Sequence, residues 1–346
     1  MNASEILPSC TLRPAEPLLP FVSDLTLSFI VPTVGYWLIS GVYLMFELFY
    51  GVEDYSPLHT PAEKLTRNRA TKSHVFYITM RNLVIQNALG WVLARRAGPD
   101  LYGCEDRDVA VWAMRLRSLQ QWIPSLLALA GIDGKSAASR VSHSMPALAQ
   151  VLAGGGQAGE FSPFLARWEL SLAHLLYYYL VPTMQFVSGY MILDTYQYFA
   201  HRMLHQNRWL YRVVHSVHHH LVVPYPWSAF YAHIIEALAV GVGSATLAFT
   251  LTGMTLRQGM WFGMGAIFNE INSHTGYDFP LSPGRLLGTS PIFHDLHHQS
   301  WGVKYNFGFY TLFWDWLCGT LWMEDEHSMR KYAEGRAMTE KKMANK

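Results

Sequence analysis

The sequence contains few charged residues. Only 15% of its 346 residues are Asp, Glu, Lys or Arg, whereas 51% are hydrophobic and 14% are aromatic. A typical soluble domain carries about 25% charged residues, so this shortfall indicates a membrane protein. Positive charge is not in excess either, because the formal net charge is +1. This excludes the basic face that a nucleic-acid partner requires.

Cysteine is scarce as well. Cys10, Cys104 and Cys318 show no CxxC spacing, so neither a disulfide framework nor a thiolate metal site is predicted. The first residues lack a basic start, an apolar run and a small-residue cleavage site, so no cleaved signal peptide is expected. Membrane insertion must therefore come from internal segments.

Long apolar runs are present inside the chain. A helix needs about 20 apolar residues to cross a bilayer. Five segments are candidates, at residues 25–49, 75–93, 170–193, 234–252 and 256–271. The second carries Arg81 and Gln86, so it either spans or packs inside the bundle, and Pro182 predicts a kink in the third. The last two are joined by three residues and predict a hairpin, which returns the chain to the membrane face it left.

The loops suggest an orientation. Lys64, Arg67, Arg69 and Lys72 lie between the first two segments, and the positive-inside rule places such a loop in the cytosol. Residues 98–131 are too polar or too short to span, so they are expected at the membrane interface. The glycine-rich stretch at residues 153–159 predicts a flexible loop.

Histidine is abundant and clustered. Nine of the 16 histidines follow metal-ligand spacings. His201 and His205 lie four residues apart, and two further clusters repeat the spacing i, i+3, i+4, which places each cluster on one face of a helix. The remaining candidates are His215, His218, His219, His294, His297 and His298, with His274 just after the hairpin.

These histidines predict a metal centre. Imidazole suits Fe, Zn, Cu and Ni, and the lack of clustered thiolates excludes soft-metal sites. Eight or nine ligands are too many for one ion, so two ions with open positions are expected, and open positions indicate catalysis. A lone histidine is usually an ordinary polar residue, and His59, His74, His143, His174, His220 and His327 are interpreted in that way.

The expected fold class is an all-α integral membrane protein. It comprises a bundle of four to six transmembrane helices with a cytosolic, histidine-rich di-metal cap, because basic residues flank the histidine clusters. The predicted regions are a transmembrane and interfacial region at residues 1–165, a catalytic domain at residues 166–327 and a charged tail at residues 328–346.

Other residues near the clusters are candidates for supporting roles. Metal-bound imidazoles usually donate their second ring nitrogen to a carboxylate or carbonyl. Candidate partners are Asp194, Asp295, Glu236, Asn272 and Asp278, although Asp194 could instead cap a helix. Tyr225, Trp227 and Tyr231 either form an interfacial belt or contact a substrate, and Tyr277 is a further substrate candidate. The aromatic stretch at residues 309–316 suggests a helix on the membrane surface.

The three histidine clusters resemble a known family pattern. HRMLH, HSVHH and HDLHH resemble the boxes of the fatty acid hydroxylase and sterol desaturase superfamily of membrane di-iron oxygenases. LRPAEPLLPF, HTPAEKLTRNR, LDTYQYFAHRMLHQNRWLYRVVHSVHH, VPYPWSAFY and FHDLHHQSWGVKYNFG are similar to its fungal sphinganine C4-hydroxylase branch. The resemblance covers most of residues 12–315 and is weakest at residues 97–165. His233 stands where that branch has an asparagine-type residue, which makes it a candidate for substrate contact.

The resemblance implies a reaction. It implies two Fe ions, O2, and electrons from cytochrome b5 with its NAD(P)H reductase, because the chain shows neither a Rossmann glycine pattern nor a haem segment. An unactivated C–H bond requires a redox metal with O2. The implied reaction hydroxylates C4 of sphinganine or dihydroceramide in the endoplasmic reticulum membrane, giving phytosphingosine-type products. Zinc fits the same imidazoles and could replace iron in a purified sample.

Two alternatives remain open. A desaturase, or an oxidase of sterols or secondary metabolites, would use the same metal architecture. A membrane metal transporter or sensor is the alternative from outside the enzymes. A transporter predicts polar residues along a path through the membrane, whereas the histidine clusters lie at the ends of the predicted spans.

Overall fold

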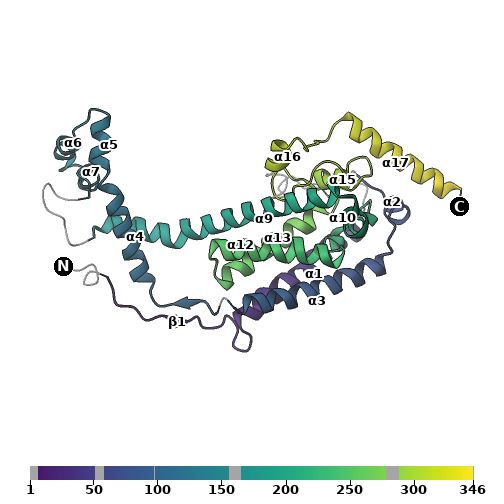
Figure 1. The fold of residues 1–346 in the computed structure, drawn as a ribbon, viewed down its shortest axis with the longest axis horizontal. Coiled ribbons are helices and arrows are strands. Elements are labelled where there is room, and N and C mark those ends of the chain that lie inside the picture. Colours follow the sequence, from purple (N-terminus) through teal and green to yellow (C-terminus); the bar gives the residue numbers. More distant parts are fainter. Residues whose placement is uncertain (1–6, 51–57, 97, 156–164, 278–287, 346) are drawn as a thin grey trace. The chain divides into compact units, whose positions relative to one another are not determined.

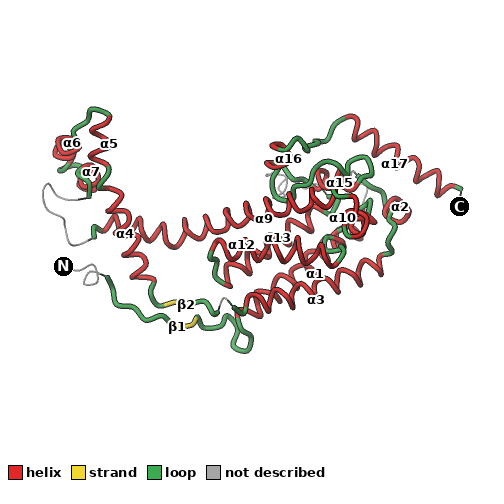
Figure 2. Tube along the Cα trace, viewed as in Figure 1, coloured by secondary structure: helices red, strands yellow, loops and turns green. Residues whose placement is uncertain are grey.

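The computed structural model describes residues 7–50, 58–96, 98–155, 165–277 and 288–345. Within these ranges the chain forms helices joined by loops, together with one two-stranded sheet (Figure 2). Packing divides the chain into two compact units. The first unit comprises residues 1–16 and 100–185, and the second comprises residues 17–99 and 186–346. The three consecutive regions expected from the sequence stay a prediction.

The first unit contains the sheet and a group of short helices. Strands β1 (Arg13–Pro14) and β2 (Leu101–Tyr102) pair antiparallel. Its helices are α4 (Glu105–Gln120), α5 (Ile123–Leu129), α6 (Gly134–Val141), α7 (Pro146–Leu152), α8 (Arg167–Leu175) and the π-helical η2 (Leu176–Leu180). The segment expected at the membrane interface thus folds into α4 and α5. A buried ion pair between Arg117 and Glu169 joins α4 to α8.

The sequence predicts no disulfide framework, and this prediction was wrong for two of the three cysteines. Cys10 and Cys104 form a disulfide, with their Cα atoms 4.9 Å apart, and Cys318 is free. The pairing of β1 with β2 brings the two residues together, since Arg13 lies opposite Tyr102. The partners are 94 residues apart in the chain, so no local spacing rule could have revealed this bond.

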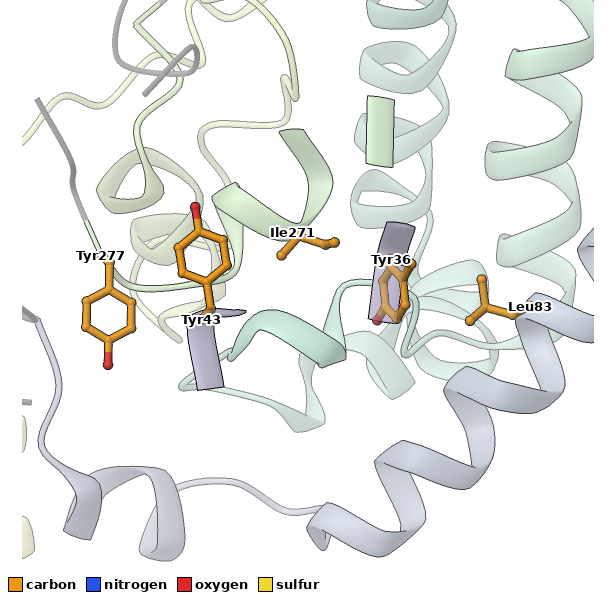
Figure 3. Close-up of a cluster of buried hydrophobic side chains, with 5 residues drawn as sticks. All are labelled: Tyr36, Tyr43, Leu83, Ile271 and Tyr277. Atoms are coloured by element: carbon orange, nitrogen blue, oxygen red, sulfur yellow. The ribbon is translucent and has the colours of Figure 1, made fainter. Parts of the chain in front are cut away.

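The second unit is built on long helices. In Figure 1, α1 (Asp24–Tyr50), α3 (Lys72–Ala94) and α13 (Leu256–Ser273) lie side by side. Helix α3 runs antiparallel to α1, because Asn87 near its end donates to Thr33 near the start of α1 at 2.7 Å. A buried cluster holds the three helices together: Tyr36, Tyr43, Leu83, Ile271 and Tyr277 (Figure 3).

Two helices of the described ranges combine the length and hydropathy of a membrane span. They are Asp24–Phe49 and Ile234–Thr252. The second consists of α11 (Ile234–Glu236), the π-helical η5 (Ala237–Val242) and α12 (Gly243–Thr252). The other three predicted spans are helical too, but they are not apolar and long enough by the same measure. A bundle of four to six spanning helices therefore stays a prediction.

The predicted hairpin is present between α12 and α13. Gly253 ends α12 with φ of 63°, a left-handed conformation that glycine adopts without strain. Thr255 then caps α13 by accepting a hydrogen bond from the backbone of Gln258. Helix α13 packs back on α12, where Gly259 leaves room for the ring of Phe249.

The remaining elements belong wholly or mainly to the second unit. They are α2 (Pro61–Thr66), α9 (Val181–Gln206), α10 (Arg208–Val213), the 3-10 helices η3 (His215–His220) and η4 (Pro226–Ser228), α15 (Pro291–His298), α16 (Phe313–Leu317) and α17 (Glu326–Ala344). The expected surface helix at residues 309–316 is shorter, because Asp194 binds the backbone of Tyr310 and Thr311. The charged tail forms α17, which Asp325 and Ser328 cap.

Candidate metal centre

The structure brings all nine predicted histidines together, in two groups. The first group contains His201, His205, His215, His219 and His297, and the second contains His218, His274, His294 and His298. Within each group, one ring nitrogen from every member lies within 4.8 Å of the others. All of these residues belong to the second unit. Only His205 among them is not fully buried.

Each three-histidine cluster is shared between the groups. The expectation that each such cluster faces one way was wrong for η3 and α15. His215 and His219 join the first group, while His218 joins the second. An α-helix such as α15 turns by about 100° per residue and a 3-10 helix such as η3 by about 120°, so neighbouring residues point in clearly different directions. Residues four apart thus reach one group, and the residue between them reaches the other.

The facing atoms of the first group are Nε2 nitrogens. Nε2 of His215 lies 3.1 Å from Nε2 of His201 and 3.1 Å from Nε2 of His219. Nε2 of His219 lies 3.2 Å from that of His205. The fifth member, His297, has a buried Nε2 without a hydrogen-bond partner among the described residues. Five donor nitrogens therefore converge on one point.

The second group repeats this arrangement. Nε2 of His294 lies 3.2 Å from that of His274 and 3.1 Å from that of His298. The ring centroids of His218 and His298 are 4.6 Å apart. The two groups adjoin, because the ring centroids of His219 and His298 are 5.0 Å apart. Two ions held by them would be close neighbours.

Hydrogen bonds at Nδ1 orient six of the rings. In the first group, His201 donates to the carbonyl of Phe307, His297 to that of Tyr305, and His215 to the carboxylate of Glu236. In the second group, the acceptors are three backbone carbonyls. His218 donates to the carbonyl of Tyr231, His274 to that of Glu270, and His298 to that of Leu221. Each bond places the single proton of a neutral imidazole on Nδ1. Nε2 is then left with a lone pair.

These lone pairs fit a metal ion. Two Nε2 acceptors that face each other at 3.1 Å cannot hydrogen-bond, so their approach is unfavourable unless a cation lies between them. Ligand nitrogens about 2.1 Å from one ion are about 3 Å apart when they subtend a right angle. The observed separations of 3.1 and 3.2 Å agree with this value. The imidazole donors suit iron, zinc, copper and nickel.

Burial favours the neutral ligand form. Desolvation lowers the pKa of His274 and of His297 from 6.5 to about 3, helped by neighbouring histidines. The pKa of His201, His215 and His298 is lowered in the same way. The rings are therefore neutral at neutral pH, with one nitrogen free to bind a metal, as metal binding requires.

Of the residues predicted to hold the histidines, some contact a histidine ring of the two groups and others do not. Glu236 does contact a ring, since Oε1 lies 2.8 Å from Nδ1 of His215. Asp194, Asp295 and Asn272 were expected to bind grouped histidines, and this is corrected. The side chain of Asp194 binds the backbone of Tyr310 and Thr311. That of Asp295 binds the ring of His59, and that of Asn272 binds the hydroxyl of Tyr43. These carboxylates and amides hold the surrounding loops and helices. Asp278 lies outside the described residues.

The substrate candidates surround the same region. Tyr231 and Tyr225 are buried, and the carbonyl of Tyr231 accepts from His218. Trp227 accepts from the hydroxyl of Tyr36 through its carbonyl. Nδ1 of His233 accepts from the backbone of Ile235 and so caps α11, a role that asparagine also fills well. Tyr277 packs against Tyr43 in the cluster of Figure 3.

Sequence reasoning missed two features of the site. The first is Asn306, which adopts a left-handed φ of 58° and separates the carbonyls of Tyr305 and Phe307 that orient His297 and His201. Asparagine tolerates this conformation, and the YNFG stretch was the available signal. The second is His59, an apparently ordinary histidine whose Nε2 binds the carboxylate of Asp295 at 3.0 Å. The HTPAE stretch was its signal.

Comparison with known proteins agrees with the site. The fatty acid hydroxylase family model matches residues 186–320. Sphingolipid C4-hydroxylase SUR2 of Saccharomyces cerevisiae is 30% identical over 327 residues, 94% of this chain and 79% of the yeast protein. Sphinganine C4-monooxygenase 1 of Arabidopsis thaliana and sphingolipid C4-hydroxylase sur2 of Schizosaccharomyces pombe are 28% and 29% identical, each over 302 residues, 86% of this chain and 88% of theirs.

No solved structure matches this chain. The residues matched by the family model contain both histidine groups in full. The similarity to the yeast hydroxylase extends over nearly the whole chain, beyond the helices that carry the histidines. The resemblance inferred from the three histidine boxes is therefore confirmed, and the chain belongs to the fatty acid hydroxylase family.

Proposed function

We propose that this chain is a di-iron, O2-dependent monooxygenase that hydroxylates C4 of sphinganine or dihydroceramide and so forms phytosphingosine-type products. The observation that carries the proposal is the convergence of nine imidazoles into two adjoining groups whose Nε2 lone pairs face one another. The similarity to C4-hydroxylases of yeast and plants supports the choice of lipid and of carbon.

Bound iron would supply the O2-derived oxidant that an unactivated C–H bond demands. The chain's own residues prepare the place for it. Six rings are held by hydrogen bonds at Nδ1, so their Nε2 atoms are pre-oriented and little reorganisation is needed on binding. Burial of the rings keeps them neutral and excludes water from the site. Electrons come from a separate donor of the cytochrome b5 type.

The product of the reaction tests this proposal. Expression in cells fed with sphinganine, followed by mass analysis of the long-chain bases, should reveal a product one oxygen heavier. His297→Ala should abolish it, because it removes one ligand of the first group. A product two hydrogens lighter would identify a desaturase instead. A lack of any oxygenated lipid, with two ions still bound, would contradict the hydroxylase.

We further propose that the histidine centre faces the cytosol from the endoplasmic reticulum membrane. Helix α1 is a candidate span, and α3 returns alongside it. If both helices cross the membrane, the basic loop between them is on one side, and the segments with Cys10 before α1 and Cys104 after α3 are on the other. Basic loops stay in the cytosol, and disulfides persist in oxidising compartments. The two indicators favour the same orientation.

Engineered glycosylation acceptors test this orientation. Ser142→Asn and Glu326→Asn both create an Asn-His-Ser acceptor at an exposed residue, and Asn2→Gln removes the natural Asn-Ala-Ser acceptor from the background. Only the Ser142→Asn variant should gain a glycan, detected as a mass shift that a glycosidase reverses. Glycosylation of the Glu326→Asn variant would place the centre in the lumen and overturn the orientation.

A further inference from the structure

Helix α15 carries an acidic residue between its histidines. Asp295 is 1% exposed, yet it binds none of the nine grouped histidines. Its carboxylate accepts hydrogen bonds from Nε2 of His59 at 3.0 Å and from the hydroxyl of Tyr332 at 2.8 Å. It also accepts from Nε2 of Gln299 at 2.9 Å. Three donors thus meet one group that only accepts.

These contacts are part of a closed ring of buried polar side chains. Glu63 binds Nδ1 of His59 at 3.4 Å and Nη1 of Arg67 at 3.0 Å. Nη2 of Arg67 donates to Oε1 of Gln299 at 2.8 Å, and Gln299 closes the ring at Asp295. His59, Glu63 and Gln299 are almost fully buried. A buried polar network of this kind is rigid when every member is satisfied.

The ring connects separate elements to the ligand helix. Glu63 lies on α2, Asp295 on α15 and Tyr332 on α17. Gln299 also donates to the carbonyl of Val222 at 2.9 Å, just after η3. An apolar cluster of Leu58, Leu296 and Tyr332 packs beside the ring. Helix α15 is therefore held against η3, the other element that supplies ligands to both groups.

The rotation of α15 matters because its ligands diverge. His297 belongs to the first group, and His298 belongs to the second. Adjacent helical residues point about 100° apart, so a single rotation of the helix aims both rings correctly. A turn in either direction would move ligands of both groups at once.

We propose that Asp295, held by His59 and Tyr332, is a positioning residue that fixes the rotation of α15 so that its histidines serve two different ions. The proposal rests on the proposed two-metal function. Asp295 binds His59 and Tyr332 and none of the nine grouped histidines, so it acts through the helix that carries it. The C-terminal helix α17 is by this means part of the metal centre, although it contributes no ligand.

The test uses Asp295→Asn in the full-length protein in detergent, titrated with Co²⁺. Asparagine has nearly the same shape, but it places an NH2 group where a donor already points, so the ring cannot close. Loss of partners beyond the ligands typically lowers metal affinity about 10-fold to 100-fold. We expect the affinity for Co²⁺ to fall about tenfold. The visible absorption spectrum, which reports the ligand geometry, should also change.

Glu169→Gln is the matched control. Glu169 is as deeply buried as Asp295 and also accepts several hydrogen bonds, from Arg117, Gln120 and the backbone of Ala166. It belongs to the first unit, whereas the histidines belong to the second. This variant should unfold at a lower temperature but bind Co²⁺ with unchanged affinity and spectrum.

Tyr332→Phe removes one donor and keeps the edge-to-face contact with the ring of His59, so it should weaken Co²⁺ binding as well, but by less than Asp295→Asn. It replaces Asp295→Asn if that variant does not fold. Wild-type Co²⁺ affinity and spectrum in both ring variants would overturn the proposal, as would an equal loss in Glu169→Gln. Two bound ions without any hydroxylated lipid would instead overturn the proposed function and leave the positioning role standing.

Discussion

The two histidine groups share ligands from η3 and α15, but they differ in the number of their members and in the charge of their partners. The first has five members, one of them partly exposed, and a carboxylate at His215. The second has four members, all buried, and carbonyl partners at three of them. A carboxylate partner raises the basicity of the ligand that it holds. The two ions should therefore differ in how firmly they are held.

The largest expected difference concerns the number of ligands. His298→Ala leaves three imidazoles in the second group, whereas His205→Ala leaves four in the first. We expect His298→Ala to lose one of two ions per chain and all hydroxylation. His205→Ala should keep both ions with weaker affinity. Metal analysis by mass spectrometry, per mole of folded protein, separates the two variants, and equal losses would show that the groups are equivalent.

The carboxylate at His215 should affect the first group alone. Glu236→Gln keeps the size of the side chain and removes its charge, so the affinity of the first ion should fall about 10-fold to 100-fold. Glu270→Gln is the matched control, because Glu270 holds His274 through its backbone carbonyl only. Chelator competition that follows both ions in each variant measures the effect. An equal loss from both ions in Glu236→Gln would contradict the comparison.

The smallest effect is a dependence on pH that acts through α15. Burial lowers the pKa of His59, but the charges and hydrogen bonds of Asp295 and Glu63 outweigh burial and raise it from 6.5 to about 8. A raised pKa gives stability that is complete below pH 6.5 and is lost as pH rises through about 8. The rise in the pKa of His59 corresponds to about 2 kcal/mol in the free energy of unfolding.

Chelator resistance at pH 6 and pH 8.5 measures this dependence. The second group takes two of its four members from α15, whereas the first takes one of five, so the second ion should become more labile at the higher pH. His59→Gln removes the titrating group and should abolish the difference between the two pH values. A pH dependence that persists in His59→Gln would assign it to other residues.

Much of the centre was predictable from local spacing. The positions of all nine grouped histidines, the hairpin before His274 and the two apolar spans follow from helical periodicity and from the length a membrane requires. These properties depend on neighbours within a few turns of one helix. A single sequence contains that information directly, so the composition and the histidine boxes also pointed to the family.

The tertiary structure alone decided how the histidines divide and what surrounds them. The split between His218 and His219 depends on the directions in which η3 presents them to other helices. The bond between Cys10 and Cys104 spans 94 residues, and Asp295 meets His59 across 236 residues. Helix periodicity determines which side chains share a face. Which distant groups meet that face is determined only when the whole chain has packed.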